Sequence, residues 1–232
     1  FQDFKLIFKL KIMYIDKWYR LHENINLSVP IVKRENVISE ISSVIDFLND
    51  LDSCNYFFSC GTALGLVREG KLLDWDTDVD IDIINPSKLL IEEITTQMQK
   101  LDYSFQRVLK RKGKYLQIVF VKEPYHSVDF CFWYKSENKK NWINDVPETY
   151  VFKRVHPINT YVRFKNIKIN NIDFRIPYNT DLYFKLLYGA DWKTPKKYKL
   201  WIKNAHDLKI DFNIFNIFLK ILWRFKIIRK SI

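Results

Sequence analysis

The 232-residue chain carries 38 Lys and Arg residues against 27 Asp and Glu residues, so its formal net charge is +11 and its pI is near 9.4. An apolar share of 47% and an aromatic share of 16%, with five glycines and seven prolines, exclude a disordered or low-complexity chain. The basic surface attracts polyanions. No RNP-like motif, Cys/His finger spacing or helix-turn-helix pattern favours nucleic acid, which is not an expected partner.

One domain with three parts is expected: an N-terminal helical flank at 1–35, a core at 36–195 and an amphipathic helical region at 196–232. Lysines interrupt the apolar runs before they reach the ~20 residues that cross a bilayer, and no cleavable signal is seen. We expect a cytoplasmic protein. The C-terminal helix either packs on the core or lies peripherally on the anionic inner face of a membrane.

The first half of the core is predicted to alternate helices with strands. Apolar residues keep helical spacing from Asn36 to Leu51. A short β-prone run at 56–60 leads into a turn at Gly61-Thr62, followed by a brief helical turn. A strand from Asp76 to Ile84 precedes a helix that opens at Asn85-Pro86 and continues to Lys100.

The second half of the core is predicted to contain strands, a hairpin and one further helix. A small mixed sheet is implied. Asn170-Asn171 is the expected hairpin turn, and Gly189 is the expected end of the helix. The elements are strands at 104–109, 115–121 and 127–134, a hairpin at 161–169 and 172–176, and a helix at 181–188.

Alternating aspartates are the most informative feature of the acidic strand. Side chains at i and i+2 share one face of a strand, so Asp76, Asp78, Asp80 and Asp82 are predicted to line one side. Carboxylates ~7 Å apart repel one another unless a hard divalent ion such as Mg²⁺ or Mn²⁺ neutralises part of their charge. The pattern therefore indicates a metal site.

A glycine turn before the acidic strand supports phosphate chemistry. Backbone N–H groups at Gly61, Thr62 and Gly65 can approach phosphate oxygens, and Arg68 can bind a phosphate through two parallel N–H bonds. Each feature has a structural alternative. Tight turns need glycine for steric reasons, and Arg68 can pair with a nearby aspartate.

Two motifs in this order resemble the signature of the LicD and fukutin-related family, which belongs to the nucleotidyltransferase-fold superfamily. They are Gly61-Thr-Ala-Leu-Gly-Leu-Val-Arg68 and Leu73-Asp-Trp-Asp-Thr-Asp-Val-Asp80, and Tyr188-Gly-Ala-Asp-Trp192 resembles the family's late Tyr-Gly-Asp-Trp element. The chain departs from the family pattern by Asp74 in place of proline, Thr77 in place of a further aspartate, and the inserted Ala190.

The resemblance implies an α/β (α+β) nucleotidyltransferase-like core, with a small mixed sheet flanked by helices and a helical C-terminal region. The implied activity transfers a phospho-alcohol, such as phosphocholine or ribitol phosphate, from a CDP-activated donor to a hydroxyl of a cell-surface glycan, releasing CMP. A lipid-linked acceptor is one form of that glycan. Mg²⁺ or Mn²⁺ would be held by Asp76, Asp78 and Asp80, while Asp82 lies outside the motif as a supporting charge.

Donor contacts are implied for four residues of the two motifs, Gly61, Thr62, Arg68 and Trp75. Lys193 is added because it adjoins Asp191-Trp192, although a lysine cluster is more often a solvated surface. Asp129 is predicted on a downstream strand, where it completes the metal site or acts as general base. Its alternative is a strand-end aspartate that faces solvent.

Two other functions remain open at this stage. A nucleotidyltransferase of the same fold would attack the α-phosphate of a nucleoside triphosphate and release pyrophosphate. A non-catalytic basic module would bind membrane or nucleic acid and retain an inactive acidic strand.

Overall fold

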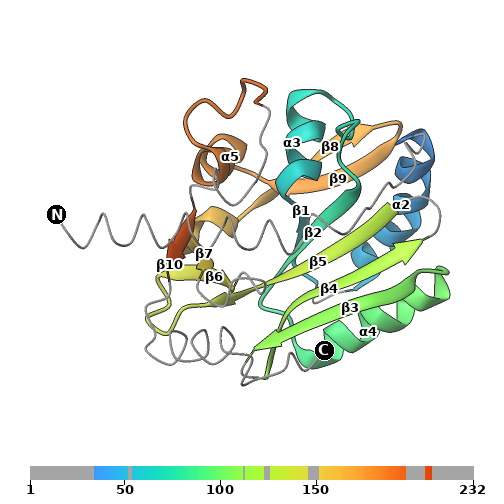
Figure 1. Ribbon diagram of the computed structural model, residues 1–232, viewed down its shortest axis with the longest axis horizontal. Helices are drawn as coiled ribbons and strands as arrows, with labels where there is room; N and C mark the ends of the chain where they lie inside the picture. Colours follow the sequence, from blue (N-terminus) through green and yellow to red (C-terminus); the bar gives the residue numbers. More distant parts are fainter. Residues whose placement is uncertain are drawn as a thin grey trace, which may run out of the picture.

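The computed structural model describes residues 34–51, 54–111, 113–122, 126–145, 152–196 and 207–210 (Figure 1). Most of the predicted N-terminal flank and most of the predicted C-terminal helical region lie outside these residues. Within the C-terminal region, Leu208–Ile210 forms the strand β10, which corrects the prediction of a helix at these positions. No described helix is long and apolar enough to cross a bilayer.

A mixed β-sheet forms the centre of the fold, as predicted, although it is larger than expected. Within the described residues it contains eight strands. The central strands β2 and β5 are parallel, and β1 and β4 extend the sheet with antiparallel pairing. The bounds are β1 Tyr56–Phe58, β2 Asp78–Ile84, β5 His126–Lys135, β4 Lys114–Lys122 and, paired to β4, β3 Ser104–Arg111.

The end of β5 leaves these strands and pairs with a second group that the sequence did not predict. This group runs antiparallel through β6 (Asn141–Asp145), β7 (Phe152–Pro157) and β10 (Leu208–Ile210). A short 3₁₀ helix, η1 (Ile158–Tyr161), follows β7. Because η1 extends to Tyr161, the hairpin starts at residue 164 and not at the predicted residue 161.

The hairpin consists of β8 (Phe164–Ile169) and β9 (Ile172–Pro177). Asn170 and Asn171 connect the strands with φ angles of 50° and 64°. Positive φ at both central residues is typical of a type I′ turn, whose twist matches that of the flanking strands. The predicted turn is confirmed.

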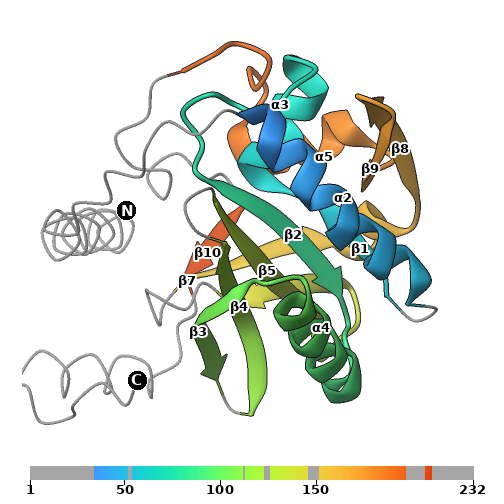
Figure 2. The same ribbon diagram turned by 90° about the vertical axis from the view of Figure 1, so that its right-hand side faces the viewer.

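In the part of the chain that the structure describes, four α-helices surround the sheet, namely α2 (Arg34–Asp50), α3 (Cys60–Arg68), α4 (Lys88–Lys100) and α5 (Thr180–Tyr188). The apolar sides of α2 and α4 contact each other and share one buried core with Val79, Ile81 and Ile83 of β2. Both views place α3 and α5 near each other at one end of the molecule (Figures 1 and 2). On the acidic face of β2, Asp78 and Asp80 are partly exposed, whereas Asp82 is buried against core residues.

Helix boundaries follow local capping chemistry. The predicted start of α4 at Asn85-Pro86 is too early, because Asn85 has a left-handed φ of 50° and the side chain of Ser87 accepts a hydrogen bond from the Leu90 N–H. The end of α5 at Gly189 is confirmed. Its φ of 91° is a conformation that favours glycine.

Candidate functional site

The glycine motif forms the first turn of α3 rather than a turn followed by a brief helix. Cys60 begins the helix, and Gly61 follows it in the first turn. A Cβ atom at Gly61 would overlap with Oδ2 of Asp76. Only glycine therefore lets the Asp76 carboxylate lie against the N-terminal end of the helix, where the helix dipole favours negative charge.

Asp76 is not part of the acidic strand, which corrects the predicted alternation. β2 starts at Asp78, and the Asp76 N–H donates to the Leu73 carbonyl over 3.1 Å in the preceding turn. Strand alternation thus places only Asp78, Asp80 and Asp82 on one face. Asp76 joins them from the loop.

Hydrogen bonds fix α3 against the middle of β2. The Asp80 N–H donates to Oγ1 of Thr62 over 2.9 Å, and the Ser59 N–H donates to the Asp80 carbonyl over 3.0 Å. Thr62 is 1% exposed. Its hydroxyl holds the strand beside the helix, and this contact is a positioning role that the donor-binding prediction did not include.

Asp129 lies in the middle of β5, directly beside Asp80 in the parallel register of β2 and β5. It is 7% exposed, so the alternative that it faces solvent is wrong. Nε2 of Gln117 donates to Asp129 Oδ2 over 2.8 Å, and Nη2 of Arg107 donates to Gln117 Oε1 over 3.2 Å. Two neighbouring strands thus orient this carboxylate.

Four aspartates act electrostatically on Asp80. Burial raises the pKa of Asp80 well above its usual value, and the charges of Asp78, Asp76, Asp129 and Asp82 raise this pKa further. Asp76, Asp78 and Asp80 are nevertheless partly exposed. A negatively charged cluster open to solvent is the kind of site at which perturbed titration indicates function.

The donor set of this cluster suits a hard divalent cation, because carboxylate oxygens are the ligands that Mg²⁺ and Mn²⁺ prefer. A bound cation would also relieve the repulsion that raises the pKa of Asp80. Within the described residues, no three His, Cys, Asp or Glu side chains are placed closely enough to hold an ion as they stand. The cluster therefore fits a divalent cation in the chemistry of its donor atoms.

Asp82 is held differently, on the inner side of the cluster. It is 2% exposed and accepts hydrogen bonds from Ser59 Oγ over 2.8 Å and from Trp133 Nε1 over 2.6 Å. Burial raises the pKa of Asp82 to about 6, opposed by the charge of Arg154 and by these two bonds. With both oxygens engaged, Asp82 has the supporting position expected from the sequence.

Arg154 on β7 lies beneath the cluster, and the sequence pattern showed it only as one of several basic residues. Its Nη1 donates to Sγ of Cys60 over 3.0 Å, and its Nε lies 3.6 Å from Oδ2 of Asp207. Asp207 also contacts Nε2 of His156 over 2.9 Å. Neither β7 nor β10 was predicted, so the sequence did not bring Arg154, His156 and Asp207 together.

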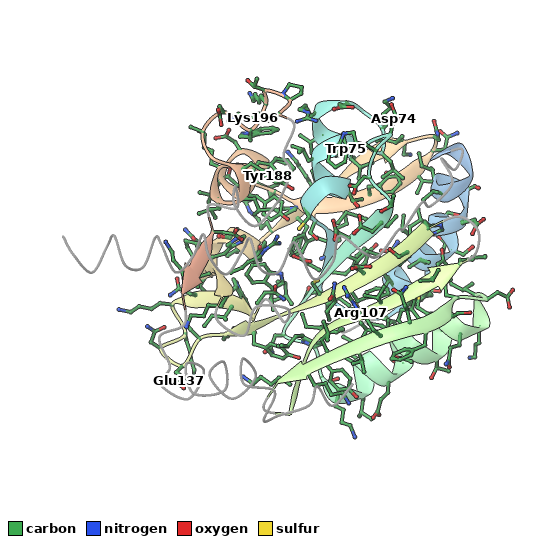
Figure 3. All side chains as sticks on the ribbon, viewed as in Figure 1. Asp74, Trp75, Arg107, Glu137, Tyr188 and Lys196 are labelled. Atoms are coloured by element: carbon green, nitrogen blue, oxygen red, sulfur yellow. The ribbon has the colours of Figure 1, made fainter. Side chains whose placement is uncertain are left out.

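Helix α5, whose last residue Tyr188 begins the Tyr-Gly-Ala-Asp-Trp motif, contacts the first turn of α3. The Cys60 N–H donates to the hydroxyl of Tyr183 over 3.0 Å. Burial raises the pKa of Tyr188 well above its usual range, and the charges of Cys60, Asp80 and Asp76 add to this effect. Figure 3 shows Tyr188 at the same end of the molecule as Trp75.

The remaining predicted donor residues are Arg68, Trp75 and Lys193. Arg68 ends α3, ~12 Å along the helix from Cys60, and its Nη2 pairs with Oε1 of Glu69 over 2.6 Å. Arg68 therefore forms an ion pair, which was its structural alternative, but its partner is Glu69 and not an aspartate. Trp75 is 70% exposed in the loop before Asp76. Nζ of Lys193 lies 5.6 Å from the ring centroid of Trp192.

A mixed sheet brings these carboxylates to the first turn of a Gly-Thr helix, and the family match identifies this arrangement as a domain of the nucleotidyltransferase type. The family model described as "LicD/FKTN/FKRP, nucleotidyltransferase domain" matches residues 53–179, which is more than half of the chain. The chain belongs to the LicD/FKTN/FKRP family. This confirms the resemblance stated from its motifs.

Among solved structures, the chain resembles the lincomycin-bound lincosamide antibiotic adenylyltransferase LnuA, with a TM-score of 0.43 and 13% sequence identity. The match covers 72% of this chain and 94% of that chain. The search of curated proteins returned no match.

Proposed function

We propose that this transferase moves a phospho-alcohol, such as phosphocholine or ribitol phosphate, from a CDP-activated donor to a hydroxyl of a cell-surface glycan and releases CMP. The observation that carries the proposal is the cluster of Asp76, Asp78, Asp80 and Asp129 beside the first turn of α3. Family membership supports the transferase class.

Asp76, Asp78 and Asp80 are the proposed holders of Mg²⁺ or Mn²⁺. Such an ion, when bound, would offset the negative charge of the donor diphosphate. The protein contributes the placement of the three carboxylates. Gly61 leaves room for Asp76, and the hydroxyl of Thr62 fixes the backbone of Asp80.

Asp129 is the proposed general base. The acceptor hydroxyl would give its proton to Asp129 while its oxygen forms a bond to the transferred phosphorus, and the phosphorus–oxygen bond to CMP would break. Gln117 holds Oδ2 of Asp129 in a fixed direction. Positioning of this kind is a large part of catalysis in phosphoryl transfer, because the protein forms no covalent bond.

Trp75, Arg68 and Lys193 are proposed donor contacts outside this cluster. The exposed Trp75 ring is available for stacking on a base. We further propose that the protein is cytoplasmic and that its glycan acceptor is lipid-linked. The region from residue 196 onward would then lie on the inner face of the membrane.

CMP release is the measurement that tests the proposal. The protein would be incubated with CDP-choline, CDP-ribitol or CDP-glycerol and a glycan acceptor, with Mg²⁺ or with EDTA. We expect metal-dependent CMP release that Asp78→Asn nearly abolishes. Asp74→Asn is the matched control, since Asp74 is an exposed motif neighbour paired with Lys71. Full activity of the Asp78→Asn protein would refute the assignment.

A nucleotidyl transfer reaction on the same fold is the second candidate, favoured by the description of the matching family model as a nucleotidyltransferase domain. Its attack would fall on the α-phosphate of a nucleoside triphosphate. Product analysis separates the two reactions, because nucleotidyl transfer releases pyrophosphate and leaves the nucleotide on the acceptor. Pyrophosphate release without CMP release would favour this second candidate.

A further inference from the structure

A second concave site lies at the far end of β2 from the carboxylates. Its volume is about 810 Å³, within the range of small-molecule sites. The wall includes Ile84, the last residue of β2, and Asn85. Ile84 is four residues beyond Asp80, a separation of ~13 Å along the strand. The pocket is therefore distinct from the carboxylate site.

Cations and aromatic rings dominate the lining of this pocket, and no acidic residue lines it. The characteristic residues are Lys135, Arg163, Arg175, Trp142, Phe164 and Tyr178. A cavity with this composition attracts an anion and excludes a cation.

Each cation lies over an aromatic ring. The guanidinium carbon of Arg163 is 4.5 Å from the ring centroid of Tyr178, and that of Arg175 is 4.6 Å from the ring centroid of Phe164. Nζ of Lys135 lies 5.5 Å from the ring centroid of Trp142. Such contacts hold a cation in place without using a carboxylate.

This packing leaves the hydrogen-bonding capacity of the two arginines available. A guanidinium over a ring keeps its in-plane N–H groups free, and these groups match two oxygens of a phosphate. Within the described residues, Arg163, Arg175 and Lys135 form no ion pair and donate no side-chain hydrogen bond. Three unneutralised cations around one cavity favour a ligand that brings negative charge.

The size of the cavity and its exposed aromatic margin favour an anion that carries an organic group. The volume of about 810 Å³ exceeds the space that a phosphate alone fills, and the ring of Tyr178 at the margin is 51% exposed. A neighbouring cavity of about 600 Å³ shares Val162, Arg163 and Tyr178 with the first. The two cavities meet at the Arg163–Tyr178 pair, so an extended ligand can occupy both.

We propose that this pocket is a second binding site for the phosphate group of a sugar phosphate, taken either as a free molecule or as a unit of a phosphorylated glycan. Arg163 and Arg175 bind the phosphate oxygens, Lys135 adds charge, and the exposed ring of Tyr178 contacts the apolar face of the sugar. This site goes beyond the proposed transfer reaction. Its occupation needs neither donor nor turnover.

Calorimetric titration of the full chain tests this site. The probes are glucose 6-phosphate, glucose, inorganic phosphate and pentamannose 6-phosphate. We expect glucose 6-phosphate to bind at least ten-fold more tightly than glucose or phosphate alone. Tighter binding of the oligosaccharide than of glucose 6-phosphate identifies the glycan as the source of the ligand, and equal binding identifies the free sugar phosphate.

Variants locate the binding and separate it from the carboxylate cluster. Arg163→Ala should weaken glucose 6-phosphate binding by about ten-fold or more, because it removes a charge-assisted contact. Lys168→Ala is the matched control, because Lys168 is an exposed cation of the hairpin that follows Arg163 and lines neither cavity. Asp80→Asn should retain the binding whether or not the transferase proposal holds.

Three results would overturn the proposal. The first is a wild-type protein that binds neither phosphorylated probe. The second is Arg163→Ala binding glucose 6-phosphate as tightly as the wild type, with both proteins folded by circular dichroism. The third is loss of binding in Asp80→Asn with retention in Arg163→Ala, which would place the phosphate at the carboxylates.

Discussion

Asp80 of β2 and Asp129 of β5 are direct neighbours in adjacent parallel strands. Both side chains lie on the same face of the sheet, and the charge of Asp129 is one cause of the raised pKa of Asp80. Like charges held side by side in a sheet cost stability and are retained where they perform a function. This pair is the centre of the candidate site.

Asp129→Asn should lower the rate of CMP release by about 10²-fold to 10⁴-fold, the usual contribution of a positioned general base. It should not lower stability, because it removes one of the charges that repel Asp80. The measurement is kcat for CMP release together with the thermal unfolding midpoint. Asp74→Asn removes an exposed charge of the same motif and should leave kcat unchanged. An inactive Asp129→Asn protein that is also unfolded would not support the assignment, whereas unchanged kcat would contradict it.

The sequence could predict this pair only in part. Strand alternation and the family motif placed Asp78 and Asp80 on one face, and the β-prone run at 127–134 placed Asp129 on a strand. That β2 and β5 are parallel neighbours in this register follows from the tertiary arrangement, in which α4, β3 and β4 connect them. Local periodicity contains no information on register between strands so far apart in sequence.

Gly61→Ala should impair activity more than stability. The added Cβ would overlap with Oδ2 of Asp76, a side-chain end that can move away, and alanine favours a helix over glycine by ~1 kcal/mol. The protein should remain folded with a displaced Asp76. A misplacement of ~1 Å can lower turnover by about 10²-fold, so kcat is expected to fall by roughly that factor. Wild-type kcat in Gly61→Ala would show that the position of Asp76 is not critical.

Gly65→Ala is the control for this prediction, because it should lower stability, which Gly61→Ala should largely preserve. A Cβ at Gly65 would lie 2.6 Å from the Lys71 carbonyl oxygen and 3.0 Å from the Leu73 nitrogen. These are backbone atoms that cannot rotate away, so we expect a loss of ~1–3 kcal/mol in the free energy of unfolding. Urea unfolding of the two variants makes the comparison. Equal destabilisation by both substitutions would contradict the assigned difference.

Gln117 is predicted to act through Asp129. Gln117→Met keeps the length of the side chain but removes the amide that donates to Asp129 Oδ2 and accepts from Arg107. We expect kcat to fall by about ten-fold with KM unchanged, and stability to fall by ~1 kcal/mol. Gln99→Met, at an exposed position of α4, should change neither quantity. A change in KM alone would indicate that Gln117 contacts a substrate instead.

The buried group behind the cluster could not be predicted from the sequence. His156 and Arg154 lie on β7 and Asp207 precedes β10, and the three meet only because these strands pair. The segment before β7 is polar and shows no clear alternation, so the strands β6 and β7 gave no signal. The pairing of His156 with Asp207 was therefore not predicted.

His156 should make stability depend on pH. It is 0% exposed, its ring nitrogens contact the Tyr161 hydroxyl and Asp207 Oδ2, and Arg154 and the Trp133 ring face it. Burial lowers the pKa of His156 below its usual 6.5, although Asp207 opposes this. The unfolded chain therefore binds more protons than the folded chain as pH falls below ~6.5, and the contribution of His156 to stability is lost on acidification.

His156→Gln removes this titrating group, so it should flatten the pH dependence between pH 7 and pH 5. The variant should also be less stable at pH 7 by ~1–3 kcal/mol, because Tyr161 and Asp207 lose a buried partner. Free energies of unfolding from urea titrations at pH 5, 6 and 7 make the comparison. If the wild type and the variant lose stability in parallel over this range, the acid sensitivity originates elsewhere, and His156 is protonated in the folded protein as readily as in the unfolded chain.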